Sequence, residues 1–303
     1  MKKIKKVSES NETVDLEEMN KKVLEISKID NFCEIQRINE PTFEISYLDI
    51  KDCKVLTIKQ MKEYVCVESH QICVSVTQEQ VTSLKEKWNI DVLAMVKNAI
   101  VQEAGMQLTK QYINKISEIS NKNYLAEYTM WDKFKVYLYK IFKKEYKKKI
   151  IVKGVKDLLT KILSESNKIA SMGRFSYGNF AICNLKTGLA LQHLSEYTYA
   201  NPDSTPTYGN IYPIGTIAGI TIYVDPNMLY TDTNVYIGRK IKNNEPGVKL
   251  FFKDSEMSKV ITQGLGAPKI EFRLRYTITS LGEATKYQYR KIEYKDDPKK
   301  FLV

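Results

Sequence analysis

Few residues of this chain have the types and spacing that side-chain catalysis requires. A cysteine nucleophile activated by histidine would need Cys66 or Cys73 to lie beside His70. All three residues fall in a segment with the pattern of a β-hairpin, where cysteine usually behaves as a small buried hydrophobe. We therefore expect these side chains to pack within the hairpin rather than to react.

Two other short motifs share letters with known active sites. Lys186-Thr187-Gly188 matches a triplet of penicillin-binding enzymes, but a Ser-x-x-Lys partner is missing. Asp225-Pro226 could supply an acid at a strand end, although such a pair more often closes a strand, because proline cannot donate to the hydrogen-bond ladder. The signatures GxxxxGK(S/T), HExxH and GxSxG are absent, as is GxGxxG after a strand. We expect neither an enzyme nor a bound cofactor.

Cysteine and histidine usage argues against a metal site. The five cysteines have irregular spacing and no CxxC pair, and two histidines are too few for most metal sites. The residues concerned are Cys33, Cys53, Cys66, Cys73, Cys183, His70 and His193. An odd number of cysteines in a chain without a secretory signal fits reduced thiols in a cytosolic compartment. No apolar stretch approaches the ~20 residues that cross a bilayer, so we expect a soluble protein.

The net charge of +11 is unevenly distributed. Residues 1–130 contain 18 basic and 20 acidic residues, whereas residues 131–303 contain 29 basic and 16 acidic residues. The densest part is "KFKVYLYKIFKKEYKKKIIVKGVK", Lys133–Lys156, in which aromatic residues alternate with lysines. Such a distribution predicts an acidic partner near the second half of the chain: nucleic acid, a membrane, or a neighbouring protein surface.

The basic segment has two readings that the sequence leaves open. Aromatic rings can stack on bases or insert into a membrane while lysines neutralise phosphates. The same pattern is typical of an amphipathic segment with a solvated cationic face. Its candidate DNA- or neighbour-facing basic patch consists of Lys143, Lys144, Lys147, Lys148 and Lys149. The shortage of arginine argues against sequence-specific base readout.

The first third of the chain contains two segments that cannot bury a core alone. Residues 1–40 are highly charged, and helical spacing of apolar residues predicts one short helix around Leu16–Ile26. Phe43–Val76 is rich in β-branched and aromatic residues and predicts one or two long hairpins. We expect the first segment to pack on another surface or to stay mobile until it does, and both segments to bury apolar area only on a neighbouring subunit.

The middle of the chain is predicted to be helical. Thr77 and Gln80 form a T-x-x-Q capping box that predicts a helix start, and Asn89–Asp91 predicts a break. Apolar residues then recur every three or four positions and predict a helix of about eight turns. They are Leu93, Val96, Ile100, Ala104, Leu108, Tyr112, Ile116 and Ile119. Gly105 costs this helix about 1 kcal/mol, so either an element packs closely there or the helix bends. A second helix is predicted over Val155–Ala170.

Beyond Met172 the chain is predicted to be mainly β. The clearest strand, Lys269–Ile278, alternates between apolar residues and residues that give a cationic face. We expect Lys286–Tyr294 to pair with it as a long antiparallel hairpin. There is no internal repeat or low-complexity linker. A chain with no recognisable active site and with segments that lack a core is typical of an assembly protein.

The order of these elements resembles the HK97-type fold of tailed-phage major capsid proteins, and the local motifs resemble the T-even myovirus branch. Four motifs carry the resemblance, which extends over about Val76–Ile278. They are "ESNKIASMGRFSYGNFAICN" (Glu165–Asn184), "GTIAGITIYVDPN" (Gly215–Asn227), "NVYIGRK" (Asn234–Lys240) and "KIEFRLRY" (Lys269–Tyr276). On this likeness, Gly215 and Gly219 let strands pack closely or bend, and Asp225-Pro226 ends a strand.

The resemblance implies an α+β fold of five parts. They are an N-terminal arm (1–40), an extended loop that is a β-hairpin over a neighbouring subunit (41–76), a peripheral domain with the spine helix and basic insert (77–171), an axial domain (172–265), and a peripheral-domain β-hairpin with a C-terminal tail (266–303). The chain is short for the T-even branch, with no inserted domain near the extended loop.

The resemblance also implies a function. It predicts a major capsid protein that assembles into hexamers and pentamers of an icosahedral phage head around double-stranded DNA. The protein would be in the virion after assembly in the host cytoplasm, with portal, scaffold and decoration proteins as further partners and no membrane. Two alternatives stay open: a basic nucleic-acid-binding module, and a vertex-forming or encapsulating-shell paralogue of the same fold.

Overall fold

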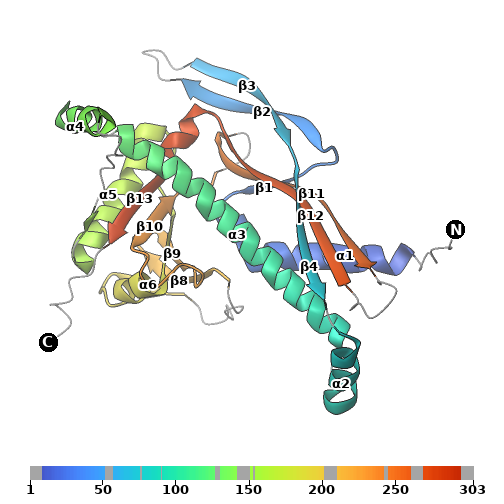
Figure 1. The fold of residues 1–303 in the computed structure, drawn as a ribbon. Helices are drawn as coiled ribbons and strands as arrows, with labels where there is room; N and C mark the ends of the chain where they lie inside the picture. Colours follow the sequence, from blue (N-terminus) through green and yellow to red (C-terminus); the bar gives the residue numbers. More distant parts are fainter. Residues whose placement is uncertain are drawn as a thin grey trace.

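A 35-residue helix, α3 (Val92–Ala126), runs through the fold and contacts both of its larger sheets (Figure 1). The computed structural model describes residues 9–51, 57–75, 77–89, 91–126, 130–141, 151–152, 154–200, 210–241, 245–260 and 269–294. All the predicted apolar positions of α3 whose side chains are described are buried, from Val96 to Ile119. The helical periodicity therefore predicted the buried face of α3 correctly, and the side chain of Leu93 lies outside the described residues.

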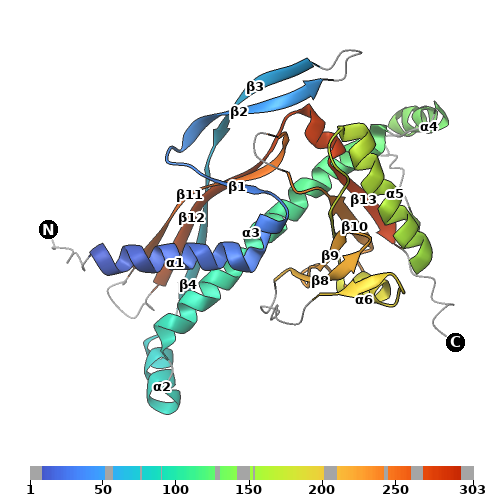
Figure 2. The ribbon, with the colours of Figure 1, turned by 180° about the vertical axis from the view of Figure 1, so that it is seen from behind.

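Two helices extend α3 at its ends (Figures 1 and 2). α2 (Gln78–Trp88) precedes it, and Asn89 between them has a positive φ of 51°, which confirms the predicted break. The helix start after Thr77 is also confirmed, whereas the side chain of Gln80 lies outside the described residues. At the other end, α4 (Met130–Ile141) covers the beginning of the basic segment.

A four-stranded sheet packs beside the first half of α3, in the order β1-β11-β12-β4. Its strands are β1 (Glu34–Arg37), β4 (Glu68–Ser75), β11 (Gly247–Val260) and β12 (Lys269–Leu281). β1 runs parallel to β11, and the other pairs are antiparallel. The predicted alternation of β12 is confirmed, because Ile270, Phe272, Leu274 and Tyr276 are buried in the main core.

A seven-stranded sheet lies toward the other end of α3, in the order β5-β13-β10-β6-β9-β8-β7. Its strands are β5 (Ile151–Val152), β6 (Phe180–Cys183), β7 (Tyr197–Tyr199), β8 (Tyr212–Ile217), β9 (Ile220–Val224), β10 (Asn234–Gly238) and β13 (Tyr289–Tyr294). The predicted second helix is α5 (Val155–Gly173), and α6 is Leu185–Gln192. Leu158, Ile162 and Ile169 of α5 are buried against this sheet.

The predicted hairpin between β12 and β13 is wrong. β12 pairs with β11 and β4, whereas β13 pairs with β10 and β5 in the other sheet. The 3₁₀ helix η2 (Glu283–Tyr287) separates the two strands, and Gly282 before it has a φ of 77°. This left-handed residue and the following turn direct the chain from one sheet into the other.

The structure also divides the expected segments differently in two places. Within Phe43–Val76, β2 (Thr42–Lys51) and β3 (Thr57–Cys66) form a separate hairpin, whereas β4 belongs to the four-stranded sheet. α5, expected beside the spine helix, packs on the seven-stranded sheet, and β11 belongs with β12 rather than with residues 172–241. β4 and β11 join the four-stranded sheet, and α5 joins the seven-stranded sheet, because each buries its apolar side chains there.

The expected arm is a helix that packs on its own chain. α1 (Glu9–Ser27) contacts α3 through Met19 and Val23, which are buried, and η1 (Ile29–Asn31) leads from it to β1. The expectation that this segment buries apolar area only on a neighbour is therefore corrected. Gly105 explains the close approach, because a Cβ at this position would lie 2.7 Å from Cγ2 of Ile26.

Gly105→Ala is expected to destabilise the protein although alanine favours a helix by about 1 kcal/mol. The added methyl group overlaps Ile26, and overpacking typically costs about 1–3 kcal/mol. In an Ile26→Ala background the overlap is removed, so the same substitution should become neutral or stabilising. Urea unfolding of the four proteins measures this cycle; an equal effect of Gly105→Ala in both backgrounds would show that α1 does not pack there.

Candidate functional site

The residues that could have formed a cysteine–histidine pair do not meet. His70 and Cys73 lie three residues apart on β4 and point to opposite faces of the strand. The His70 ring stacks on Tyr276 at 4.2 Å between centroids, its Nδ1 lies 3.3 Å from Nε2 of Gln111, and burial lowers its pKa. Cys66 and Cys73 are exposed, so the expectation that they are buried is wrong, although their place in strands is confirmed.

Asp225 closes a strand, as its position before proline predicted. It follows β9, and its Oδ1 accepts hydrogen bonds from the backbone N and from Nδ2 of Asn227, at 2.9 and 3.1 Å. Burial raises the pKa of this carboxyl group. Gly215 and Gly219 have the expected roles: a Cβ at Gly215 would overlap the Thr198 carbonyl, and Gly219, with a φ of 81°, turns β8 into β9.

Lys186-Thr187-Gly188 forms the first turn of α6 and is structural. Asn184 caps this helix, since its Oδ1 accepts a hydrogen bond of 2.9 Å from the backbone N of Thr187. Nδ2 of Asn184 donates to the carbonyl oxygens of Leu229, Tyr230 and Asp232. This single side chain therefore fixes the loop between β9 and β10 against α6.

The β2–β3 hairpin is the element that stands out from the body in both ribbon views (Figures 1 and 2). One face of its base is apolar, and this face packs on Phe251 of β11 and Leu281 of β12. The buried side chains of this face are Ile45, Tyr47 and Val65. The other face is polar, with Glu44 paired to Lys62 at 2.5 Å. The base is thus attached to its own chain, so the expectation that the hairpin buries apolar area only on a neighbour is wrong for this part. The rest of the hairpin extends away from the body in both ribbon views.

α4 presents a row of exposed apolar side chains, which we call the α4 stripe. Its members are Met130, Trp131, Phe134, Tyr137 and Leu138, with exposed fractions from 88% at Met130 to 37% at Leu138. The basic patch predicted from the sequence follows α4, but Lys143, Lys144, Lys147, Lys148 and Lys149 lie outside the described residues.

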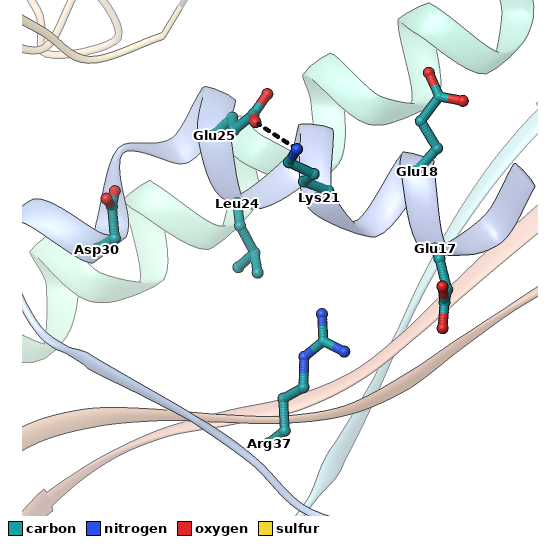
Figure 3. A pocket seen from close by; sticks show the side chains of 7 residues that line it. All are labelled: Glu17, Glu18, Lys21, Leu24, Glu25, Asp30 and Arg37. Carbon is teal, nitrogen blue, oxygen red and sulfur yellow. Dashed lines mark ion pairs between the residues drawn. The ribbon is translucent and has the colours of Figure 1, made fainter. Parts of the chain in front are cut away.

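A cleft of about 510 Å³ separates α1 from β1 (Figure 3). We call it the acidic cleft; its lining residues are Glu17, Glu18, Lys21, Leu24, Glu25, Asp30 and Arg37. Lys21 pairs with Glu25 at 3.9 Å, and Arg37 points into the gap from β1. The cleft lies between two neighbouring elements of the chain, which η1 joins, and sequence reasoning did not find it.

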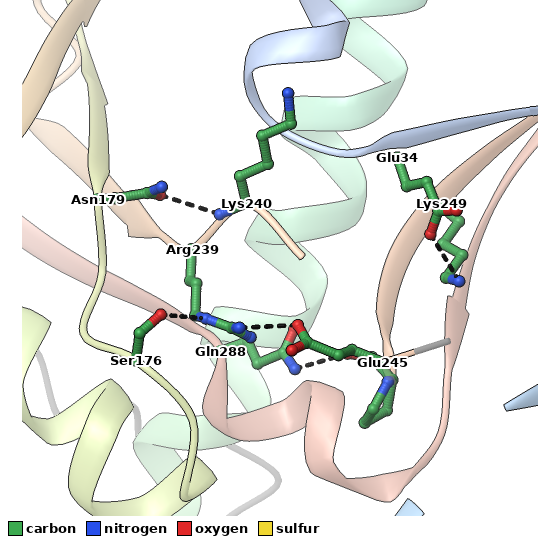
Figure 4. Close-up of polar contacts among 9 residues, drawn as sticks. Glu34, Ser176, Asn179, Arg239, Lys240, Glu245, Lys249 and Gln288 are labelled. Atoms are coloured by element: carbon green, nitrogen blue, oxygen red, sulfur yellow. Dashed lines mark hydrogen bonds and ion pairs between the residues drawn. The ribbon is translucent and has the colours of Figure 1, made fainter. Parts of the chain in front are cut away.

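Buried ionic contacts hold the segments that pass between the two sheets (Figure 4). Arg239, at the end of β10, donates from Nε to Oγ of Ser176 at 2.6 Å and from Nη2 to Oε2 of Glu245 at 2.7 Å. Lys249 of β11, 1% exposed, pairs with Glu34 of β1 at 2.8 Å. The cationic face of β12 is also paired, because Arg275 contacts both Asp254 and Glu256 of β11.

Glu165 of α5 is a buried carboxylate between two lysines. Burial alone would raise its pKa, but hydrogen bonds from Lys161 and Lys168, both at 2.9 Å, lower it below the usual 4.5. The neighbouring Ser166 donates from Oγ to the carbonyl of Gly178 at 2.8 Å, and Oδ1 of Asn179 accepts from the backbone N of Lys240 at 2.9 Å. The motif of residues 165–184 is therefore a structural junction rather than a ligand loop.

Glu165→Gln is expected to cost about 1.5–3 kcal/mol at pH 7, because it removes charged hydrogen bonds to two lysines. A carboxyl group whose pKa is lowered on folding stabilises the fold above its unfolded pKa, near 4.5, and loses this contribution as pH falls through the folded value. Unfolding free energies of both proteins from pH 7 to 3 test this. A difference that stays constant below pH 4.5 would show that the carboxylate is not the cause.

Within the described ranges, no group of three or more His, Cys, Asp or Glu side chains could hold a metal ion. The described helices include none that is both long and apolar enough to span a bilayer. Burial raises the pKa of the Cys183 thiol to about 12, which disfavours the reactive thiolate. The β2–β3 hairpin and α4 project from the body in both ribbon views.

Comparisons with known proteins agree with this arrangement. The model of the family described as Major capsid protein Gp23 matches residues 3–299. A search of curated proteins found no match. A solved structure from Microbacterium phage Oxtober96 is 14% identical, with a TM-score of 0.54, covering 88% of this chain and 90% of that chain.

Two further structures have the same fold. One from Mycobacterium phage Adephagia is 10% identical, with a TM-score of 0.54, covering 89% of this chain and 90% of that chain. The capsid structure of the Cyanophage P-SCSP1u is 10% identical, with a TM-score of 0.52, covering 87% and 86%. The likeness confirms the expected α+β fold of the HK97 type.

Proposed function

Because this chain belongs to the Gp23 family of major capsid proteins, we propose that it builds its shell from rings of five and six copies in which each β2–β3 hairpin lies over a neighbouring subunit. The protein is a major capsid protein of an icosahedral phage head, a structural protein of the virion that binds copies of itself. The observation that carries the proposal is the hairpin, whose base packs on its own chain while β2 and β3 extend away from the body in both ribbon views.

The two sheets give this proposal its geometry. We assign the seven-stranded sheet with α5 and α6 to the axial domain, which meets its copies at the ring centre. The four-stranded sheet with α1 and α3 is assigned to the peripheral domain. A ring of identical subunits requires heterologous contacts, in which one surface of a subunit meets a different surface of the next.

We further propose that the shell encloses double-stranded DNA and that the T-even branch is the nearest one. The four ordered sequence motifs support the branch. The excess of basic residues after residue 130 supports DNA, since lysines offset phosphate repulsion without reading sequence. Assembly in the host cytoplasm, with portal, scaffold and decoration proteins, belongs to the same proposal, and a vertex-forming or encapsulating paralogue is its alternative within the fold.

The basic patch provides a test of the DNA proposal. Changing Lys143, Lys144, Lys147, Lys148 and Lys149 to Gln is expected to weaken DNA binding and to reduce the slope of log affinity against log salt by up to about 4. Lys85→Gln with Lys87→Gln on α2 is the matched control and should change little. Filter binding at several salt concentrations measures the slope, and light scattering follows assembly. If the five-lysine variant forms no shells, the patch contacts a neighbouring subunit. If the variant binds DNA and assembles as before, the patch has neither a DNA-binding nor a neighbour-binding role.

The shell proposal itself is tested by light scattering and sedimentation of the purified chain at two salt concentrations. Large particles or discrete rings are expected. A nucleic-acid-binding module would instead sediment as a monomer that binds DNA, and this result would overturn the proposal.

A further inference from the structure

The α4 stripe is an apolar surface that the body of the same chain does not cover. Met130 is 88% exposed, Trp131 76% and Tyr137 63%, and the rings of Trp131 and Phe134 contact each other edge to face at 6.4 Å. Spacings of three and four residues place these side chains along one side of α4. A contiguous exposed patch of large apolar residues usually marks a surface that binds a partner.

The positive charge on and after α4 indicates that its partner is acidic. α4 also carries the exposed Lys135, and it opens the half of the chain that has an excess of basic residues. Phosphate groups alone would pair with the lysines but would leave the large apolar side chains in water, including the non-aromatic Met130 and Leu138 that cannot stack on bases. A protein surface that combines an apolar floor with acidic side chains satisfies both parts of α4, and in a homo-oligomer that surface is present on every copy.

The acidic cleft has this combination. Its lining contains four carboxylates but only two basic side chains, and it includes the apolar Leu24 (Figure 3). Glu17, Glu18 and Glu25 are exposed, so they are open to a cationic partner. The volume of about 510 Å³ is sufficient for more than one side chain of a docked helix.

The cleft and the stripe of one chain lie apart. α1 packs at Gly105, and from there to Ala126 the helix α3 rises about 30 Å before α4 begins. In both ribbon views α4 lies at one end of α3, while α1 crosses the other half (Figures 1 and 2). The hairpin extends toward the α4 end, so one neighbour would meet both elements.

We propose that the α4 stripe of one subunit docks in the acidic cleft of the next subunit in the ring. The contact is heterologous, as closure of a ring requires, and it rests on the proposed function as a shell subunit. Trp131 and Phe134 would lie toward Leu24, and Lys135 would lie among the carboxylates of the cleft.

Substitution of two stripe residues tests the contact. Trp131→Ser with Phe134→Ser is expected to reduce the fraction of chains in particles at least tenfold, without lowering the melting temperature of the subunit. The control is Trp88→Ser on α2, which removes an equally exposed tryptophan (72%) at the far end of α3 and should leave assembly unchanged. Normal particles from the stripe variant would overturn the proposal, and so would an equal loss from the control.

Cross-linking between two populations identifies the partner surface. Both carry serine at Cys53, Cys66 and Cys73; one adds Met130→Cys at the edge of the stripe and the other Lys21→Cys at the edge of the cleft. A short bis-maleimide is expected to join the two populations only in mixed particles. Cross-links between two α4 helices, or none in intact shells, would reject the docking while the shell function stands. If the unmodified chain forms no particles, the proposed function fails first.

Discussion

Shortening the β2–β3 hairpin is expected to give folded subunits that form no closed shells. Tyr47 and Met61 are partners across the hairpin, so residues 48–60 can be replaced by an Asn-Gly turn that joins these two positions. The base that packs on Phe251 and Leu281 is kept, and the melting temperature should change by only a few degrees. The removed part includes the ends of β2 and β3 that extend away from the body in both ribbon views, so assembly should fail while folding succeeds.

Replacing only residues 48–60 is a cleaner test than deleting all of Phe43–Val76. That deletion would also remove β4 and expose Phe272 and Tyr276 of β12, so failure to assemble would reflect misfolding. A matched control changes Glu44 and Lys62 to Gln and keeps the hairpin at full length; it should form normal shells because this pair is exposed. Closed particles from the shortened protein would refute the role of the hairpin.

Arg239→Ala is expected to lower the free energy of unfolding by about 2–3 kcal/mol. Arg239 holds Ser176, which follows α5, and Glu245, which leads to β11, and its guanidinium lies 4.9 Å from the ring centre of Phe175. The Arg239 side chain is only 5% exposed, so its loss removes both contacts and the packing on Phe175 at the junction of the two sheets.

Two further variants sharpen this prediction. Arg239→Lys should recover little of the loss, because an ammonium group cannot serve Ser176 and Glu245 with the fixed geometry of a guanidinium. Arg273→Ala removes an arginine that is 42% exposed and 3.9 Å from Glu256, and should change stability by less than about 0.5 kcal/mol. Urea unfolding compares them, and equal losses at Arg239 and Arg273 would contradict the account.

Helical periodicity made α3 predictable, since one long apolar face needs only local spacing to be recognised. The sequence allows either close packing or a bend at Gly105, and the structure shows close packing by α1. The Asn89 break and the strand-ending role of Asp225 were likewise local, because they follow from backbone preferences of single residues.

Pairing between distant strands was less predictable. β12 and β13 are neighbours in sequence and both alternate, yet Gly282 and η2 turn them into different sheets. The strand β11 contains Lys249, whose burial is possible only because Glu34 of β1 lies opposite it. Neither fact can be read from local patterns, because each depends on a partner remote in the chain.

The proposed interaction surfaces have a signal in the sequence only in part. Alternating aromatic residues and lysines predicted an acidic partner near residues 133–156, and α4 lies at the start of that segment. The acidic cleft had no such signal, because its carboxylates are spread over α1 and the turn after it and become a surface only when β1 pairs with β11.

Electron microscopy of the purified chain is the most direct test of the proposal that this protein builds a shell from rings of five and six copies. We expect closed shells, or tubes and isolated rings. Their projections should contain rings of five and six subunits in which each hairpin overlaps a neighbouring subunit. A chain that remains a monomer at both low and high salt and nevertheless binds DNA would contradict the proposal.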